Sequence, residues 1–177
     1  MRILRYTVLA LIFLIVLVAI GGLFLPSKVS MSRSVFIEKP TEIIFKFVNS
    51  QKNFNDWSPW FGLDPKAVYT ISGAESGVGS KISWQGNEKV YKGSNEIIES
   101  EENKLVRYEL YFGKSDQPAF SNMSFSPVGN GTTVVWTFEN DFGYNVFYRY
   151  FGLILEDMIA PDYEKGLSNL KVRLEKQ

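Results

Sequence analysis

The sequence predicts an α+β protein, in which an antiparallel sheet carries helices on one face and is preceded by one N-terminal transmembrane helix. Three features predict this architecture. Residues 6–25 form an uncharged apolar run. Residues 67–139 contain short strand-like segments separated by turn residues, and residues 145–176 carry apolar side chains three and four positions apart. Strands flanked by helices in this order are typical of α+β folds.

The composition narrows the function classes. The 177 residues include no Cys and no His, which excludes disulfides, Cys/His zinc sites, Ser-His-Asp triads and a histidine general base. The 19 basic residues balance the 19 acidic ones, so charge gives no reason to expect a nucleic-acid partner. Apolar residues make up 45% of the chain, as in folded domains. We expect no metal and no cofactor.

The apolar run YTVLALIFLIVLVAIGGLFL lies between Arg5 and Pro26. As a helix at about 1.5 Å per residue it would span about 30 Å, the thickness of a bilayer's hydrocarbon core. The apolar region of a cleaved signal peptide is shorter, about 7–15 residues, and Ala19-Ile20-Gly21 is a poor cleavage site. These features favour an uncleaved signal anchor over a signal peptide. We therefore assign residues 1–27 to a single-pass anchor in the cell (plasma or inner) membrane.

The charges around the anchor predict its orientation. Arg2 and Arg5 precede the helix, whereas Lys28 and Arg33 follow it. The positive-inside rule favours a cytoplasmic N-terminus, with the C-terminal domain, residues 28–177, outside the cytoplasm. Beyond residue 25 the chain has a net charge of −2 and no basic cluster that would attract anionic lipid.

Residues 28–177 are expected to fold as one domain. A strand at residues 30–38 has Val35 and Ile37 on one face. Pro40 suits the first turn of the helix that follows, and a short helical turn is expected at residues 53–57. Six more strands are expected at residues 67–72, 80–85, 93–100, 104–112, 119–126 and 132–139. Turn residues separate them at 72–73, 76–77, 86–87, 101–103, 113–114 and 129–131.

The last strand has the cleanest alternation, with Val134, Trp136 and Phe138 on one face. Such alternation is expected of an antiparallel sheet with one face covered and one solvated. The covering element is the helix expected over residues 145–176. Pro161 falls inside this helix and should kink or break it near Ala160.

Five local segments resemble a known superfamily. Residues 32–40 (SRSVFIEKP) resemble the opening strand and helix start of the START-like superfamily, also called SRPBCC. Residues 55–60 (NDWSPW) resemble its Trp-rich segment, and residues 73–81 and 84–87 resemble its next hairpin. Residues 161–167 (PDYEKGL) resemble the last helix of a membrane-anchored bacterial branch of its polyketide cyclase/dehydrase-like group. The resemblance implies the helix-grip fold, in which a curved antiparallel sheet wraps around a long C-terminal helix and an apolar ligand cavity lies between them.

The candidate ligand-binding residues are large apolar side chains expected to line that cavity or its mouth. Each one is also compatible with ordinary core packing, and only the resemblance assigns them to a cavity as a set. Trp57 and Trp60 either form a lid or close the end of the sheet. The full set is Trp57, Trp60, Trp84, Tyr108, Leu110, Phe112, Met123, Phe125, Trp136, Phe151, Leu155 and Met158.

The favoured function is a membrane-anchored domain that binds or carries a hydrophobic small molecule or lipid. Two alternatives stay open. One is a polyketide cyclase/dehydratase-like enzyme on an apolar substrate, in which Asp, Glu, Tyr or Lys would act as acid or base. No catalytic residue can be assigned, and the missing His argues against catalysis. The other is an envelope protein-interaction module, which would need a large exposed apolar patch. The sequence does not identify the ligand, a protein partner or the oligomeric state.

Overall fold

The computed structural model describes every residue except Met1, Lys114 and Gln177. One residue of the turn expected at 113–114 therefore lies outside the described residues. The chain divides into two compact units. The first comprises Met1–Val29 and Asp141–Met158, and the second comprises Ser30–Asn140 and Ile159–Gln177.

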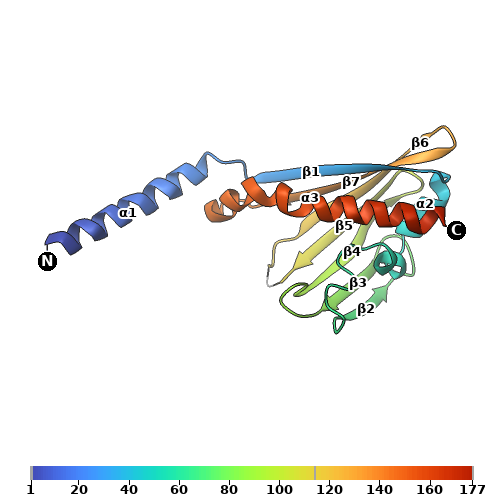
Figure 1. The fold of residues 1–177 in the computed structure, drawn as a ribbon, viewed down its shortest axis with the longest axis horizontal. Helices are drawn as coiled ribbons and strands as arrows, with labels where there is room; N and C mark the ends of the chain where they lie inside the picture. Colours follow the sequence, from blue (N-terminus) through green and yellow to red (C-terminus); the bar gives the residue numbers. More distant parts are fainter. Residues whose placement is uncertain (1, 114, 177) are drawn as a thin grey trace. The chain divides into compact units, whose positions relative to one another are not determined.

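The order of elements is a helix, a strand, two short helices, six strands and a long helix, as the sequence predicts (Figure 1). The helices are α1 (Arg2–Leu23), α2 (Thr41–Val48), the 3₁₀ helix η1 (Gln51–Asp56) and α3 (Val146–Glu175). The strands are β1 (Lys28–Ile37), β2 (Val68–Gly73), β3 (Ser80–Gln85), β4 (Lys92–Glu101), β5 (Leu105–Phe112), β6 (Ala119–Val128) and β7 (Gly131–Asp141).

The seven strands form one sheet in the order β1-β7-β6-β5-β4-β3-β2. From β2 to β7 each strand pairs antiparallel with the next one along the chain. A register shift interrupts the β4–β5 ladder between Ile97 and Glu99. Such bulges bend a strand and increase its twist, which suits a curved sheet.

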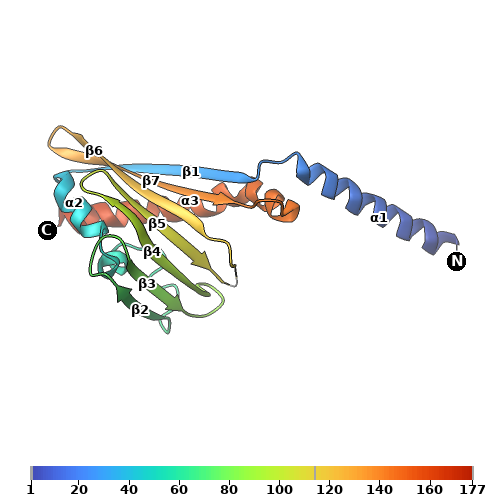
Figure 2. The same ribbon diagram turned by 180° about the vertical axis from the view of Figure 1, so that it is seen from behind.

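One face of this sheet carries the core of the second unit. On β7, Val134, Trp136 and Phe138 are buried and alternate with partly exposed residues, which confirms the expected pattern. The second half of α3 crosses this face, in front of the sheet in Figure 1 and behind it in Figure 2. Three leucines on that half of the helix are almost fully buried: Leu167, Leu170 and Leu174.

Of the two effects expected at Pro161, a break near Ala160 is wrong, because α3 runs without interruption through Pro161, and a kink there stays a prediction. Proline removes one backbone N–H and crowds the carbonyl four residues earlier, which bends a helix more often than it ends one. Pro161 lies on the exposed side of α3, where water can hydrate the freed carbonyl.

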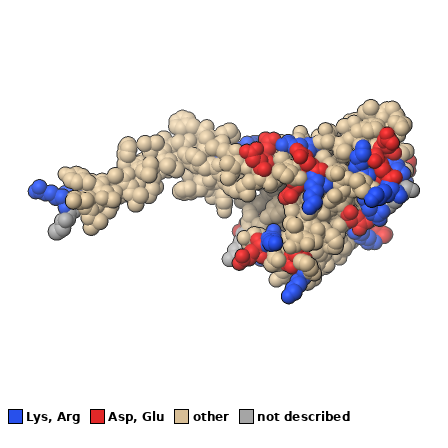
Figure 3. Space-filling model, in the orientation of Figure 1, with Lys and Arg blue, Asp and Glu red and all other residues tan. Residues whose placement is uncertain are grey.

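In the first unit, α1 is exposed over most of its length, and Gly22 near its end is buried. By length and composition alone, it is apolar enough to cross a membrane, with a mean hydropathy of 2.8 over its most apolar stretch. Figure 3 shows charged side chains only at the start of this helix. Over the second unit the same view shows both signs of charge interspersed, so that face has no large single-sign field.

Candidate ligand pocket

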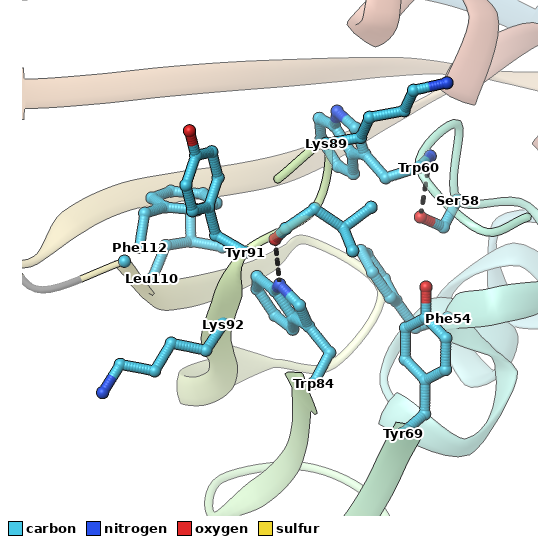
Figure 4. A pocket seen from close by; sticks show the side chains of 12 residues that line it. Phe54, Ser58, Trp60, Tyr69, Trp84, Lys89, Tyr91, Lys92, Leu110 and Phe112 are labelled. Atoms are coloured by element: carbon cyan, nitrogen blue, oxygen red, sulfur yellow. Dashed lines mark hydrogen bonds between the residues drawn. The ribbon is translucent and has the colours of Figure 1, made fainter. Parts of the chain in front are cut away.

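A pocket of about 370 Å³ lies in the second unit, towards the β2 edge of the sheet. A volume of this size falls within the range of about 300–1,000 Å³ that is usual for small-molecule sites. Side chains reach it from η1 and the loop after it, from β2 to β5, and from the β3–β4 loop (Figure 4). The lining residues, half of them aromatic, are Phe54, Ser58, Trp60, Tyr69, Trp84, Lys89, Val90, Tyr91, Lys92, Leu110, Phe112 and Gly113.

Trp84 on β3 forms one wall of the pocket, and a glycine makes room for it. Trp84 pairs with Gly93 on β4, which pairs with Phe112 on β5. A Cβ on Gly93 would overlap both the Trp84 ring and the carbonyl of Tyr111. Because Gly93 has none, the indole lies across the sheet with its ring centroid 6.0 Å from that of Phe112. The indole N–H donates to the Val90 carbonyl at 3.0 Å, which ties this wall to the β3–β4 loop.

Asp64 joins the two loops that flank the pocket. Its buried carboxylate accepts the backbone N–H of Lys66 at 2.9 Å and that of Asn87 at 2.7 Å. A Cβ on Gly86 would lie 2.7 Å from Asp64 Oδ2, so glycine is required for this close approach. In the same loop Tyr91 has a φ of 51°. Such a conformation costs of order 1–3 kcal/mol in a non-glycine residue and is concentrated at binding sites.

Trp60 separates the pocket from an aromatic cluster in the core. Its indole N–H donates to Asp162 Oδ2 on α3 at 2.9 Å. Its ring centroid lies 6.1 Å from that of Trp136 and 6.3 Å from that of Tyr163. Trp136 and Tyr163 stack at 3.9 Å, and Gly166 permits this packing because a Cβ there would lie 2.7 Å from the Trp136 ring. Aromatic rings therefore fill the space between the second half of α3 and the sheet, and none of the residues that line the pocket comes from α3.

The ionisable groups of the pocket are tyrosines and lysines. Burial and the nearby charge of Asp64 raise the pKa of Tyr69, so its hydroxyl is a neutral hydrogen-bond donor at pH 7. Lys89 and Lys92 are exposed, and their aliphatic stems line the pocket while the ammonium groups reach outward (Figure 4). Neither ammonium forms an ion pair within the part of the chain that the structure describes. The rim therefore carries positive charge, and no carboxylate belongs to the twelve lining residues.

The twelve residues predicted to bind a ligand fall into three groups. Trp60, Trp84, Leu110 and Phe112 come together in the pocket. The core of the second unit buries Trp57, Tyr108, Met123, Phe125 and Trp136. The first half of α3, in the first unit, carries Phe151, Leu155 and Met158, of which only Leu155 is buried. Contact with a ligand stays a prediction for all twelve.

Trp57 and Tyr108 are large side chains that pack in the core and do not line the pocket. Trp57 is 2% exposed and meets Trp136 edge to face at 5.1 Å, so it closes the end of the core. Tyr108 is also buried, and its hydroxyl donates to the Val48 carbonyl at 3.1 Å. Burial raises the pKa of Tyr108 far above its usual range, which keeps it protonated.

The sequence prediction missed eight of the lining residues: Phe54, Ser58, Tyr69, Lys89, Val90, Tyr91, Lys92 and Gly113. One signal was present in the β3–β4 loop, where Lys89 and Lys92 enclose Val90 and Tyr91 one residue after the Gly86-Asn87 turn. The bond from Trp60 to Asp162 left no local signal, because 102 positions separate the two residues.

Comparison with known proteins identifies the family. Residues 28–175 match the family model described as polyketide cyclase/dehydrase and lipid transport. The chain belongs to this family. The match covers all seven strands and α3, and it confirms the START-like resemblance. No curated protein sequence matches the chain.

Solved structures support the same fold. A protein of unknown function from Staphylococcus aureus superposes with a TM-score of 0.63 at 11% identity, covering 84% of this chain and 94% of that one. A Mycobacterium smegmatis protein gives 0.58 at 13% identity, with coverages of 84% and 92%. A Chromobacterium violaceum protein gives 0.57 at 13% identity, with coverages of 81% and 95%. Identities this low show the helix-grip fold alone.

Proposed function

We propose that this chain is a membrane-anchored domain that binds a hydrophobic small molecule or lipid in the pocket beside β2 to β5. The observation that carries the proposal is the lining itself: about 370 Å³ of space with six aromatic side chains among its twelve lining residues. A few hydroxyl groups, such as those of Ser58 and Tyr69, supply the sparse polar contacts that orient a ligand in such sites.

The rim favours a ligand with an acidic head. Lys89 and Lys92 lie on different sides of the pocket with their ammonium groups towards solvent (Figure 4). A carboxylate or phosphate at the mouth would face these cations while the apolar body lay against Trp84 and Phe112. Because both lysines are exposed, we expect their contribution to be modest and to weaken with added salt.

Binding is better supported than acid–base catalysis. A general acid or base must lie within hydrogen-bond reach of the reacting group and have a pKa near the working pH. No Asp or Glu is among the lining residues. The raised pKa of Tyr69 keeps that hydroxyl protonated at neutral pH, so it is not available as a general base.

Several contacts within the first unit support an uncleaved anchor. Arg149 donates from Nη1 to the carbonyl of Leu23 at 3.1 Å and to that of Leu25 at 3.2 Å. The Tyr150 hydroxyl donates to the Val18 carbonyl at 2.9 Å. These contacts involve residues on both sides of the weak cleavage site at Ala19-Ile20-Gly21. Cleavage there would remove the Val18 acceptor.

A thermal-shift panel on the full chain in detergent micelles tests the proposal. The panel contains fatty acids, phospholipids, quinones and polycyclic aromatic compounds. A ligand at 100 times its Kd stabilises the folded state by about 2.7 kcal/mol, which for a domain of this size raises Tm by roughly 5–10 °C. The proposal predicts such a shift for at least one class, and the absence of a shift with every class would refute it.

A further inference from the structure

The first half of α3 packs against the C-terminal end of α1 within the first unit. Two glycines permit the approach: a Cβ on Gly21 would lie 2.8 Å from the Tyr150 hydroxyl, and one on Gly22 would lie 3.0 Å from Val146 Cβ. The Arg149 guanidinium bonds carbonyls at the end of α1 and also the carbonyl of Gly143. A helix end leaves such carbonyls without partners, and a cation there also complements the helix dipole. The two segments therefore form one hydrogen-bonded body.

This half of α3 exposes a continuous apolar face. Phe147, Phe151, Ile154 and Met158 follow one another at spacings of four, three and four, which places them on one side of a helix. All four are between 39% and 68% exposed. By helical spacing Glu156 lies on the opposite side, whereas exposed Asp157 lies at the edge of the stripe, three positions after Ile154. Tyr148 and Leu153 are also exposed on other sides of this half of the helix, and exposed Tyr144 precedes it.

The contact between the helices sets the depth of the Tyr150 hydroxyl if α1 crosses a bilayer. Val18, which accepts the Tyr150 hydroxyl, lies five residues before the last residue of α1. At about 1.5 Å per residue, the hydroxyl lies roughly 7–8 Å inside the end of the span. Helices that lie in the membrane interface are buried about 5–10 Å into the boundary between headgroups and acyl chains. Tyr is also enriched at this level.

We propose that residues 144–158 lie in the membrane interface as a second membrane contact, with Phe147, Phe151, Ile154 and Met158 among the lipid acyl chains. The occupant of the apolar stripe is thus the bilayer itself. The inference rests on the proposed anchoring by α1 and is independent of ligand binding. It gives Phe151 and Met158, predicted from the sequence as cavity residues, a role on the lipid side of the helix.

Single-cysteine labelling of the full chain tests this directly, because the chain has no cysteine of its own. Phe151→Cys and Ile154→Cys carry an environment-sensitive nitrobenzoxadiazole label in nanodiscs that hold one copy each. Both side chains are exposed, so neither substitution removes a core residue. Phe13→Cys, near the middle of α1, reports the anchor, and Ser126→Cys, exposed on β6, reports water. Lipids with a nitroxide at acyl carbon 5 or carbon 12 serve as shallow and deep quenchers.

The inference predicts that the Phe151 and Ile154 labels emit at shorter wavelength than the Ser126 label and lose most of their emission to the carbon-5 quencher. The Phe13 label should respond most to the carbon-12 quencher. If Phe13 is quenched while Phe151 and Ile154 behave like Ser126, the inference is overturned and the anchor stands. If Phe13 is not quenched, the anchor itself is refuted. A third outcome combines two results. The Phe151 and Ile154 labels are blue-shifted without lipid quenching, and energy transfer occurs between differently labelled copies in larger vesicles. These results would assign the stripe to contact with a second copy and overturn the inference.

Discussion

Replacing Gly93 with alanine tests the wall that Trp84 forms. At an ordinary strand position alanine is more favourable than glycine by about 0.5–1 kcal/mol. At Gly93 we expect the opposite sign, because the new Cβ would come within 3.0 Å of the Trp84 ring and of the Tyr111 carbonyl. That carbonyl belongs to β5, so it cannot retreat without disturbing the β4–β5 ladder. Both the Trp84 side chain and the local β4–β5 backbone must therefore shift.

The expected change in the free energy of unfolding is the cost of overpacking less the intrinsic gain from alanine. Overpacking of a well-filled site costs about 1–3 kcal/mol. After allowance for the intrinsic gain from alanine, the free energy of unfolding should fall by about 0.5–2 kcal/mol. For a domain of this size that corresponds to a Tm lower by roughly 1–8 °C. Displacement of the Trp84 ring should also weaken any ligand bound in the pocket.

Thermal unfolding of the full chain in detergent micelles, followed by far-ultraviolet circular dichroism, measures the change. Ser94→Ala is the matched control, because Ser94 neighbours Gly93 on the same strand and points to the opposite face. A partly exposed surface substitution of this kind should stay within about 0.5 kcal/mol of the parent chain. A Gly93→Ala protein as stable as the parent, or more stable, would refute the packing of Trp84 over Gly93.

Three further predictions concern the pocket and the core. Leu110→Trp should fill the pocket and abolish the ligand-induced thermal shift, measured with whichever compound shifts the parent chain. Lys89→Gln with Lys92→Gln should lower the affinity for a fatty acid several-fold, measured by titration at low salt, because exposed charge pairs contribute only up to about 1 kcal/mol each. Burial raises the pKa of Tyr108 and Tyr163, whereas both ionise near pH 10 when unfolded, so the unfolded state loses these protons first. The free energy of unfolding should therefore fall above about pH 10 by about 1.4 kcal/mol per pH unit for each tyrosine, and Phe at either position should reduce that slope in alkaline denaturation curves.

Control variants separate these specific effects from a general loss of stability. Phe125→Leu, in the core away from the pocket, should lower stability and leave the ligand-induced rise in Tm intact. A Leu110→Trp protein that keeps this rise in Tm would contradict the assignment of the pocket. Lys104→Gln should leave fatty-acid affinity unchanged. Equal loss of affinity for a fatty acid and its alcohol would rule out recognition of an acidic head. An unchanged alkaline slope in both Phe variants would contradict the burial of the two hydroxyls.

The fold could be predicted from the sequence because its signals are local. Each strand has its own alternation and its own turn residues, and β3 begins and ends at the residues expected. The burial of Val134, Trp136 and Phe138 follows from a period of two that needs no knowledge of distant residues. The unbroken α3 departs from the local rule because Pro161 lies on the exposed side of the helix, where the missing bond does little harm.

The pocket could be predicted only in part, because distant residues decide which aromatic side chains pack in the core and which line open space. Trp136 and Trp84 look alike in sequence, each on a strand and facing the covered side of the sheet. Trp136 is stacked against Tyr163 from α3, whereas Trp84 faces the loop carrying Lys89 and Tyr91. No pattern within a strand distinguishes the two environments.

Native mass spectrometry of the full chain purified from its own host membrane can show whether the pocket holds a ligand. We expect a small molecule bound to the parent chain and its loss from the Leu110→Trp variant purified in parallel. Ligand binding in this pocket is ruled out if the parent chain carries no small molecule, or if both proteins carry an adduct of equal mass and occupancy.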